Sequence, residues 1–463
     1  MKRYLEVVEQ ATNLHHAGEY DKAAYLYENL LGNQPTDPAV LYLYGTLHLQ
    51  LGRFGTAMLM LRQSVDIEPK AIPEAWHNLG AALRNEGHRE QSLLAYQRCL
   101  TLRPNDAGTL AMMAGSYINA GQPGMAVEYA RRALEQDGEN PHAHNHLALG
   151  LLELGKYKEA WPHYERRYEL TGYLTPRPFT CPRWDGKPVR KLAIHGEQGI
   201  GDEIMFMSCF EELAKLADEV VVECTPRLTT LFEKNFGVQC YGTADELLAA
   251  HPDCDAYLPM GSLPALCRNS SSDFPGTPYL HPDESRVEEM ERKLKKISAK
   301  EDGSRPYVGI AWYGGTKQTH QEVRNPDMNM FKAVIAQVRE LGGTPISVQY
   351  GEDGAEQAQE LGLPHWKYAV DDMEGQAALV KALDLVISPC QTVIHVAGAV
   401  GTDCLCLTPS QPAWRYKTRG DMDWYNSVEL LRQKGNDWGS VFDKVKFKLD
   451  ERYGEGFEME AVA

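Results

Sequence analysis

The chain has 463 residues and an apolar content of 43%, so two or three domains with well-formed cores are expected. Its formal net charge of −17 argues against a broad basic surface for nucleic acid or anionic lipid. The N-terminus lacks the apolar core of a signal peptide, and no later stretch approaches the ~20 apolar residues of a membrane span. We therefore expect a soluble, cytoplasmic protein.

The first third of the chain is built on a repeat. Glycines recur at intervals of 34 or 35 residues, and a small residue follows each of them five positions later. The glycines are Gly18, Gly52, Gly87, Gly121 and Gly155, and the small residues are Ala23, Ala57, Ser92, Ala126 and Ala160. In the third unit, Trp76, Leu79, Gly80 and Leu83 match the tetratricopeptide (TPR) pattern. The sequence predicts a TPR solenoid of five repeats over residues 1–170.

Each repeat is expected to be a pair of helices. The glycine ends the first helix, the small residue lets the two helices approach closely, and Pro35, Pro69 and Pro104 end the second helices of the first three units. Such units bury their apolar faces only against their neighbours, which leaves a concave groove. We expect this groove to bind a protein. A scaffold or dimerisation module without a client is the alternative.

A proline-rich connector over residues 171–190 follows the array. Four prolines interrupt the chain within thirteen residues, at 176, 178, 182 and 188. They exclude a long helix or a central strand, and Phe179 and Trp184 are the side chains expected to pack this segment.

Strands and helices alternate over the rest of the chain. Predicted strands lie at 192–194, 219–224, 238–241 and 255–260, and again at 307–312, 345–350, 385–388 and 403–408. A stretch rich in Ser, Pro and Gly at 269–283, followed by a charged helix at 284–297, separates the two groups of strands. We predict two Rossmann-like α/β domains, 191–305 and 306–463, with mainly parallel sheets and a ligand cleft between them.

A glycine loop joins the first strand to the first helix of this region. Residues 192–208 read LAIHGEQGIGDEIMFMS, which is an apolar strand, a loop with three glycines and an amphipathic helix that opens with two acids. Free backbone N–H groups at such a helix start favour a phosphate, and the acids can accept a proton. An ordinary βα turn is the alternative.

A TPR array followed by four ordered motifs carries a family resemblance: GEQGIGDEIMF, then GIAWYGG, then ALDLVIS with HVAGAVG, and last WRY with DWYNSVELLRQ. In this order they resemble the bacterial TPR-linked glycosyltransferases of the GT-B type, relatives of the heptosyltransferases of lipopolysaccharide synthesis. Some members modify flagellin. The family's ISxDTAxxHLAGA run reads ISPCQTVIHVAGA here, so Cys390 stands where an acid is usual.

Glycosyl transfer needs a group that stabilises the leaving phosphate and a group that accepts the acceptor's proton. We assign the first task to the C-terminal half, where glycines after a strand, nearby cations and a helix start converge. The candidate donor-binding residues are Gly314, Gly315, Thr316, Lys317, Arg324, Gln349, Thr392 and His395. The structural alternatives are a solvated loop charge for Arg324 and a packed helical histidine for His395.

The N-terminal half is expected to supply the proton acceptor. Asp202 matches the proposed base of the heptosyltransferase relatives, and its position at a helix start favours the ionised form. A helix cap is the alternative role, and Glu203, Glu197 and His195 are the substitute bases within the same loop. Further residues expected on the acceptor side or in the cleft are Glu197, Gly199, Gly201, Trp414 and Tyr416. For the aromatic residues Trp414 and Tyr416, packing of a long terminal loop is the alternative.

No residue pattern predicts a metal site. The ten cysteines include no CxxC pair. His142, His144 and His146 alternate in a way that fits one helix face poorly, so we interpret them as polar surface or groove residues. The DxD pairs at 253/255 and 421/423 lie before a strand and in a loop, so we interpret both as chance. We expect no essential metal and no cofactor, with the nucleotide-sugar as a co-substrate.

The sequence thus predicts an inverting, metal-independent protein O-glycosyltransferase. By resemblance its client is flagellin, modified on Ser or Thr, and its donor is a CMP-nonulosonic acid. One alternative keeps the chemistry but transfers the sugar to a glycan or lipopolysaccharide. Another is a TPR adaptor whose α/β region has lost catalysis, which the cysteine at position 390 would be consistent with.

Overall fold

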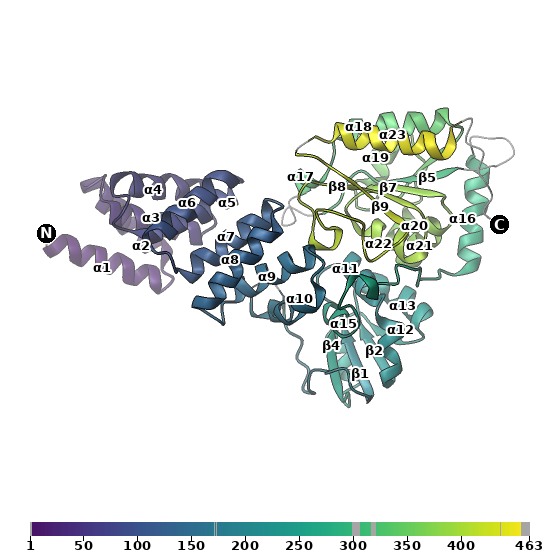
Figure 1. Ribbon diagram of the computed structural model, residues 1–463, viewed down its shortest axis with the longest axis horizontal. Coiled ribbons are helices and arrows are strands. Elements are labelled where there is room, and N and C mark those ends of the chain that lie inside the picture. The colour runs from purple at the N-terminus through teal and green to yellow at the C-terminus, as the bar shows by residue number, and fades with distance from the viewer. Residues whose placement is uncertain are drawn as a thin grey trace. The chain divides into compact units, whose positions relative to one another are not determined.

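The computed structural model describes residues 2–170, 172, 174–298, 306–315, 321–435 and 437–454. The chain divides into two compact units, Met1–Leu151 and Leu152–Ala463. Figure 1 shows helices in the first unit, and sheets flanked by helices in most of the second. The division falls inside the fifth predicted repeat, whose second helix belongs to the second unit, while the predicted limits at 170, 190 and 305 stay predictions.

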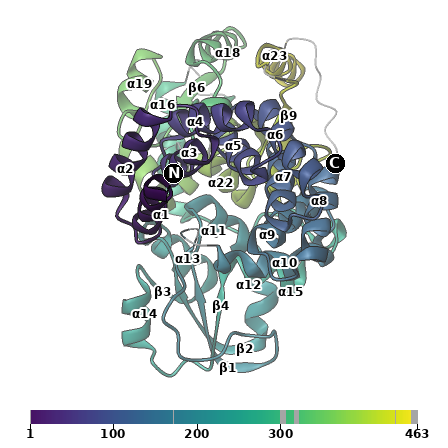
Figure 2. The same ribbon diagram turned by 90° about the vertical axis from the view of Figure 1, so that its left-hand side faces the viewer.

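The first unit consists of helices that pack against their neighbours in sequence (Figure 2). Their bounds are α1 (Lys2–His16), α2 (Tyr20–Asn33), α3 (Pro38–Gln50), α4 (Phe54–Ile67), α5 (Pro73–Asn85), α6 (Arg89–Leu102), α7 (Ala107–Asn119), α8 (Pro123–Gln136) and α9 (Pro141–Glu153). The helix pairs α1–α2, α3–α4, α5–α6 and α7–α8 correspond to the first four predicted repeats.

The residues that define the repeat have the roles predicted for them. The glycines that end the first helices have left-handed φ angles, +77° at Gly18 and +82° at Gly87, which other residues rarely adopt. The small residues at the repeat period are fully buried, among them Ala57 and Ser92. Each of the three prolines stands two residues beyond the end of a second helix, as Pro104 does after α6. These parts of the repeat prediction are confirmed.

Two of the three alternating histidines of α9, His144 and His146, form hydrogen bonds with backbone carbonyls. His144 is buried and bonds the Gly138 carbonyl through Nε2 at 2.9 Å, so its prediction as a surface or groove residue is wrong. His146 bonds the Ala111 carbonyl through Nδ1 at 2.8 Å, and burial lowers its pKa to about 4. Among the described residues, no group of three or more His, Cys, Asp or Glu side chains could hold a metal ion.

The first sheet of the second unit is parallel, with the described strands in the order β3-β2-β1-β4. It comprises β1 (Val189–His195), β2 (Ala217–Glu223), β3 (Gln239–Tyr241) and β4 (Ala256–Pro259). The accompanying helices are α10 (Tyr157–Tyr164), α11 (Ile200–Met207), α12 (Phe210–Leu213), α13 (Thr229–Phe236), α14 (Ala244–Ala250) and α15 (Leu263–Cys267), with α16 (Glu284–Ile297) leading away. All four strands were predicted, because each is a short apolar run between loops.

The second sheet is also parallel, with the described strands in the order β6-β5-β7-β8-β9. Its strands are β5 (Tyr307–Ile310), β6 (Thr344–Ser347), β7 (Leu385–Pro389), β8 (Cys404–Thr408) and β9 (Val428–Arg432). The helices are α17 (Gln321–Arg324), α18 (Met328–Glu340), α19 (Gly354–Glu360), α20 (Lys367–Asp371), α21 (Met373–Lys381), α22 (Thr392–Val400) and α23 (Gly439–Tyr453). The prediction missed β9, an edge strand whose Glu429 and Arg432 break the apolar run.

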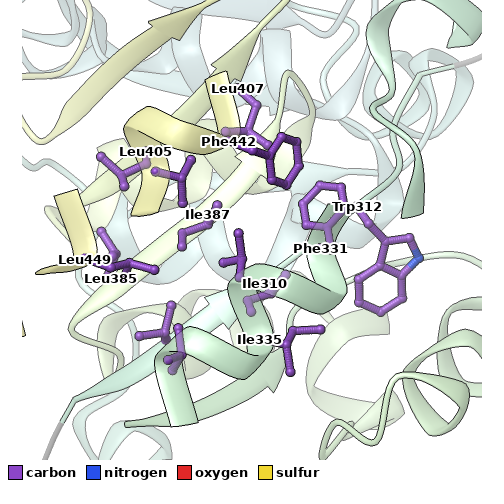
Figure 3. Close-up of a cluster of buried hydrophobic side chains, with 14 of the residues drawn as sticks. Ile310, Trp312, Phe331, Ile335, Leu385, Ile387, Leu405, Leu407, Phe442 and Leu449 are labelled. Carbon is purple, nitrogen blue, oxygen red and sulfur yellow. The ribbon is translucent and has the colours of Figure 1, made fainter. Parts of the chain in front are cut away.

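The core of the second sheet lies between its strands and the helices α18 and α23 (Figure 3). Ile310, Ile387 and Leu405 come from three neighbouring strands and are fully buried. Phe331 of α18 meets Phe442 of α23 edge to face, with ring centroids 5.1 Å apart. Burial of this apolar area stabilises the packing of α18 and α23 on one face of the sheet. The carboxyl ends of the strands stay available for a site.

The connector packs on the first sheet as predicted. Trp184 is buried, and its indole N–H donates to the Lys187 carbonyl at 2.7 Å. The Phe179 ring stacks on Tyr257 of β4, with centroids 4.8 Å apart and planes 8° from parallel. These two aromatic side chains hold the proline-rich segment against the sheet.

Candidate functional site

The loop between β1 and α11 makes a strained turn. β1 ends at His195, and α11 begins at Ile200 after Gly199, an extended N-cap residue. Gln198 has a φ of +66°, a left-handed conformation that costs a residue with a Cβ roughly 1–2 kcal/mol. The Gln198 side-chain amide donates to the Tyr164 hydroxyl at 2.7 Å, which helps to hold the turn. The acids in and next to this loop are therefore held in defined positions, and each has different hydrogen-bond partners.

Glu197 is held by a buried arginine. Arg167 is 1% exposed and donates to the Glu197 carboxylate from Nε at 3.1 Å and from Nη2 at 2.6 Å. Its guanidinium lies over the rings of Tyr164 and Tyr168 at 4.6 and 4.9 Å, and the Tyr168 hydroxyl donates to the same carboxylate. Glu197, predicted to line the cleft, is thus one half of a buried ion pair.

Glu203 has neutral partners only. Its Oε2 accepts the backbone N–H of Thr225 at 2.9 Å, and its Oε1 accepts the Thr225 hydroxyl at 2.7 Å. The side chain is 4% exposed, and burial raises the pKa of its carboxyl to about 7. In the described part of the chain, no ion pair involves Glu203. Glu203 therefore changes protonation near neutral pH.

His195 is an uncharged aromatic side chain in this environment. Its ring stacks on Phe179 and Tyr257, with centroids 5.7 and 6.1 Å apart, and Nδ1 bonds the Gly196 carbonyl at 3.2 Å. Burial lowers the pKa of His195 to about 4. As a substitute base it would have to act from within this stack.

A pocket of about 370 Å³ opens at the carboxyl ends of β1, β2 and β3. Glu203 and Thr225 face it from α11 and from the end of β2, and Glu197 and Gln198 face it from the glycine loop. The remaining lining residues are Tyr168, Leu174, Thr175, Arg177, Gly196, Glu223, Cys224, Pro226 and Gly242. Carboxylates, hydroxyls and amides dominate this lining, which suits a polar ligand that donates hydrogen bonds.

A second acid of the pocket is neutralised by the connector. Glu223, the last residue of β2, receives Arg177 through two parallel bonds, Nε to Oε2 at 3.2 Å and Nη2 to Oε1 at 2.9 Å. Such a bidentate pair fixes both groups. Prediction from the sequence overlooked this pair and Thr225. Their only signal was position, since an acid and a threonine that follow a buried strand lie at the carboxyl edge of its sheet.

Asp202 does not line this pocket. It lies in the first turn of α11 and forms an ion pair with Arg415 of the C-terminal half, in which both side chains are largely buried. Beside it, a Cβ at Gly201 would lie 2.8 Å from the His395 ring, so α11 and α22 touch at this point. Figure 1 shows these two helices next to each other. Asp202, the predicted base, thus links the two halves.

The glycine pair after β5 packs against protein. The amide of Asn325 bonds Gly314 twice, accepting its N–H at 3.0 Å and donating to its carbonyl at 3.1 Å. A Cβ at Gly314 would lie 2.5 Å from Gln391 Cβ, and Gly315 has a φ of +83°. The tight loop therefore requires glycine at both positions, because Gly314 has no room for a Cβ and Gly315 has a left-handed φ. The next two predicted residues, Thr316 and Lys317, lie outside the described residues.

Gln349 supports this loop from within. Its Oε1 accepts the N–H groups of Trp312 and Tyr313 at 3.0 Å each, and its Nε2 donates to the carbonyls of Tyr313 and Tyr350 at 2.9 and 2.8 Å. The side chain is 1% exposed. Its amide is fully used by the backbone, which differs from the predicted contact with a bound nucleotide.

His395 lies between two tyrosines. Its Nε2 is 3.1 Å from the Tyr416 hydroxyl and its Nδ1 is 3.4 Å from the Tyr425 hydroxyl. Burial lowers the pKa of His395 to about 3, so the ring is neutral. His395 and Tyr416 were predicted to face the donor and the cleft, respectively. The structure brings them together as a buried hydrogen-bonded pair.

Two polar groups at this edge lack partners among the described residues. Gln391, the N-cap of α22, is 7% exposed, and its Oε1 makes no hydrogen bond, while its Nε2 donates to Ser388. The Nε of Arg415 is likewise buried and unbonded. The predicted residue Thr392 is the first of α22, so the free N–H groups of that helix begin here.

Arginines give the second edge a positive character. Arg324, the last residue of α17, is close enough to Cys390 and Tyr416 to act on both electrostatically, and Arg432 acts on Cys390 as well. The Cys390 thiol itself is buried, 3.7 Å from Cys406 Sγ. The position that is usually an acid in the resembling family is therefore occupied by a packed thiol beside cations.

Trp414 packs the C-terminal loop. It is 8% exposed, and its ring meets Trp161, Tyr164 and Trp424 edge to face at centroid distances of 6.0–6.3 Å. Packing was the alternative to its predicted role in the cleft, and these contacts favour packing.

The two DxD pairs are engaged by cations and hydroxyls. Asp253 pairs with Arg190 and Lys191, and Asp255 with Arg190. Asp423 accepts bonds from Lys417, Tyr157 and Ser271. Asp253, Asp255 and Asp423 thus have partners within the protein, and Asp421 is exposed.

Comparison with known proteins identifies the repeats. Models of the tetratricopeptide repeat match residues 14–83, 73–106 and 112–172. The N-terminal region is a tetratricopeptide repeat array. The TPR array covers the segment where the repeat was predicted, and such arrays bind proteins.

The chain is similar to Protein FlbA of Caulobacter vibrioides, with 28% identity over 436 residues that cover 86% of this chain and 70% of FlbA. A match of this length extends beyond the TPR array into the α/β region. The tetratricopeptide repeat-containing protein trd-1 of Caenorhabditis elegans is 23% identical over 182 residues, which cover 33% of this chain and 23% of that protein.

Solved TPR structures resemble part of the chain. MamA is 19% identical, with a TM-score of 0.33, and the match covers 36% of this chain and 92% of MamA. YrrB, described as a TPR protein with an unusual peptide-binding site, is 16% identical, with a TM-score of 0.31, and the match covers 36% of this chain and 84% of YrrB.

Within the described residues, no helix combines the length and apolar character needed to cross a membrane.

Proposed function

We propose that this chain is a GT-B-type glycosyltransferase that transfers a sugar from a nucleotide-sugar to Ser or Thr of a protein recruited by its TPR array. One observation carries the proposal. The first turns of α11 and α22, which follow the carboxyl ends of two different parallel sheets, touch at Gly201 and His395. In parallel α/β sheets, ligands bind outside the carboxyl ends of the strands, so this arrangement favours two ligands that meet.

The charges at the two edges support the division of roles. The N-terminal half contributes acids and a polar pocket, which suit an acceptor that must lose a proton. The C-terminal half contributes Arg324, Arg415 and the start of α22, which suit a leaving phosphate. We propose direct displacement with inversion at the anomeric carbon, and no step in it calls on a metal.

The client and donor come from the family resemblance. Flagellin is the proposed client, and a nonulosonic acid carried on CMP is the proposed donor. The TPR array supports a protein client, since an enzyme that acts only on small acceptors has no need of a protein-binding solenoid.

The test uses the full chain and intact-mass spectrometry. The protein is incubated with flagellin from its own organism and, in separate reactions, with CMP-N-acetylneuraminate, CMP-pseudaminate, UDP-N-acetylglucosamine, ADP-heptose and GDP-mannose. We expect one donor to add its sugar mass to flagellin. Transfer to a lipopolysaccharide core oligosaccharide but not to flagellin would assign the glycan alternative. No mass shift with any donor, together with no nucleotide binding by calorimetry, would favour the inactive adaptor.

A further inference from the structure

We infer that the acceptor alcohol enters the 370 Å³ pocket at the carboxyl ends of β1, β2 and β3, and that Glu203 takes its proton. The inference rests on the proposed function and assigns its catalytic base to a residue other than Asp202. It concerns a pocket lined by the N-terminal half and by the segment 168–177 before it, with no residue of the C-terminal half, so its contribution is separable from donor binding there.

The pocket offers one acid that is free to accept a proton. Glu197 is held by the Arg167 guanidinium, Glu223 by the two parallel bonds of Arg177, and Asp202 by Arg415 outside the pocket. A carboxylate in an ion pair loses that attraction when it is protonated. Glu203 has only the N–H and O–H of Thr225 as partners, so protonation breaks no ion pair.

The position of Glu203 is set by its neighbours. Thr225 occupies one lone pair on each carboxylate oxygen, which leaves the others for an acceptor. A Cβ at Gly196 would lie 3.0 Å from Glu203 Cδ, so the absence of a side chain there leaves room for the carboxylate. Thr225 is thus a positioning residue, and Gly196 makes space at the floor of the pocket.

The charged surroundings of Glu203 are consistent with a base that works near neutral pH. Its pKa is raised to about 7 because burial and the nearby Glu223 raise it by more than the bonds from Thr225 and the charge of Arg177 lower it. The titratable groups that face it are Glu223 and Cys224 at the end of β2 and Arg177 of the connector. A general base is most effective when its pKa lies close to the working pH.

The Ser or Thr hydroxyl of the client gives its proton to Glu203, and its oxygen forms a bond to the anomeric carbon of the nucleotide-sugar. The bond from that carbon to the nucleotide's phosphate oxygen breaks, and the electron pair leaves with the nucleotide. The Glu203 proton then passes to solvent, and no oxidant or reductant is involved.

The first test compares Glu203→Gln with the wild type, using flagellin and the donor identified above. We expect Glu203→Gln to lower kcat by ~100-fold or more while donor binding by calorimetry stays within twofold. The matched control is Glu219→Gln, a substitution of the same kind on β2 that removes a half-exposed ion pair with Lys191 outside the pocket. The control is expected to keep wild-type kcat.

A second variant keeps the inference testable if Glu203→Gln fails to fold. Thr225→Val removes the hydroxyl that donates to Glu203 Oε1 and that lowers its pKa. We expect the acidic limb of the kcat/KM profile, near pH 7 in the wild type, to move to higher pH in Thr225→Val. A merely structural threonine would change stability without moving this limb.

The outcomes separate the two proposals. Glu203→Gln at the wild-type rate, or an acidic limb unmoved in Thr225→Val, overturns the assignment of Glu203 while the transferase function stands. Loss of the acidic limb in Asp202→Asn, with the limb kept in Glu203→Gln, assigns the base to Asp202 and overturns the inference as well. A wild-type protein that transfers no sugar overturns the proposed function and this inference with it.

Discussion

The carboxyl edges of the two parallel sheets share an architecture but differ in chemistry. At the first edge, Glu197, Glu203 and Glu223 surround an open polar pocket. At the second edge, Arg324, Arg415 and Arg432 lie near the buried side chains of Cys390 and Tyr416. The polar atoms of Gln349 and His395 are hydrogen-bonded to the backbone and to tyrosine hydroxyls, respectively. The same fold element therefore presents a pocket lined by acids on one sheet and arginines beside packed side chains on the other.

The two edges also differ in how their charges are balanced. At the first edge, Arg167 neutralises Glu197 and Arg177 neutralises Glu223. Both arginines come from the segment between α10 and β1, which precedes the sheet in sequence. At the second edge, Arg415 pairs with Asp202, which comes from the N-terminal half. The first edge is thus complete by itself, whereas the second is completed by contact between the halves.

Replacing Arg167 should have the largest effect on stability. Arg167→Met leaves Glu197 as a buried, unpaired carboxylate, so we expect a loss of about 3–5 kcal/mol in the free energy of unfolding of the second unit. Seven of the eight tryptophans lie in that unit, so urea unfolding followed by tryptophan fluorescence reports it. Lys187→Met removes a fully exposed pair with Asp185 and should change little. An equal effect of both variants would show that the first edge does not depend on its buried arginine.

Glu203 should make stability depend on pH at the first edge. Its folded pKa of about 7 lies above its ordinary value of 4.5, so the folded chain binds the proton more tightly than the unfolded chain. This stabilisation is present below pH 4.5 and is lost as the pH rises through 7, a change of about 3 kcal/mol. Between pH 5 and pH 8, Glu203→Gln should therefore lose less unfolding free energy than the wild type, as urea titrations at each pH would measure. Parallel curves for both proteins would mean that Glu203 titrates normally.

Asp202 should couple to Arg415 across the halves. Asp202→Asn leaves a partly buried guanidinium without its carboxylate, and we expect a loss of about 1–2 kcal/mol in unfolding free energy. The double variant Asp202→Asn with Arg415→Gln should recover part of this loss, so a double-mutant cycle by urea unfolding should give a coupling energy of about 1 kcal/mol. Additive effects would argue against the link between the edges.

Tyr416 should have the smallest effect. Tyr416→Phe removes the hydroxyl next to His395 Nε2 and leaves that nitrogen buried, so we expect a loss of about 0.5–1.5 kcal/mol in unfolding free energy. Tyr25→Phe removes a hydroxyl from a side chain that is 65% exposed and serves as the control in thermal unfolding. If His395 contacts a ligand directly, Tyr416→Phe should instead weaken nucleotide binding without changing stability.

Much of the fold could be predicted from the sequence. The glycine period of 34 or 35 residues and the short apolar runs between loops are local signals, and the TPR array and most strands followed from them. Strand β9 was missed because an edge strand with Glu429 and Arg432 has no continuous apolar pattern. GT-B organisation stays a prediction by resemblance.

The candidate site could be predicted only in outline. The glycine loop and its acids were found because a strand, a loop and a helix follow one another in sequence. The sequence did not distinguish Asp202 from Glu203, which are neighbours with the same charge. It also could not indicate that Gln349 and His395 are engaged by the protein itself, since both residue types suit a ligand equally well.

The repeats, the alternation of strands and helices and the acids at a helix start could be predicted from the sequence, because each depends on residues within a few turns of one another. Which of the two neighbouring acids, Asp202 or Glu203, faces the pocket depends on contacts with distant segments and so required the fold. Glu203 bonds Thr225, 22 residues later, and Asp202 pairs with Arg415, 213 residues later. The protonation behaviour of a carboxyl depends on its burial and its partners, and the fold supplies both.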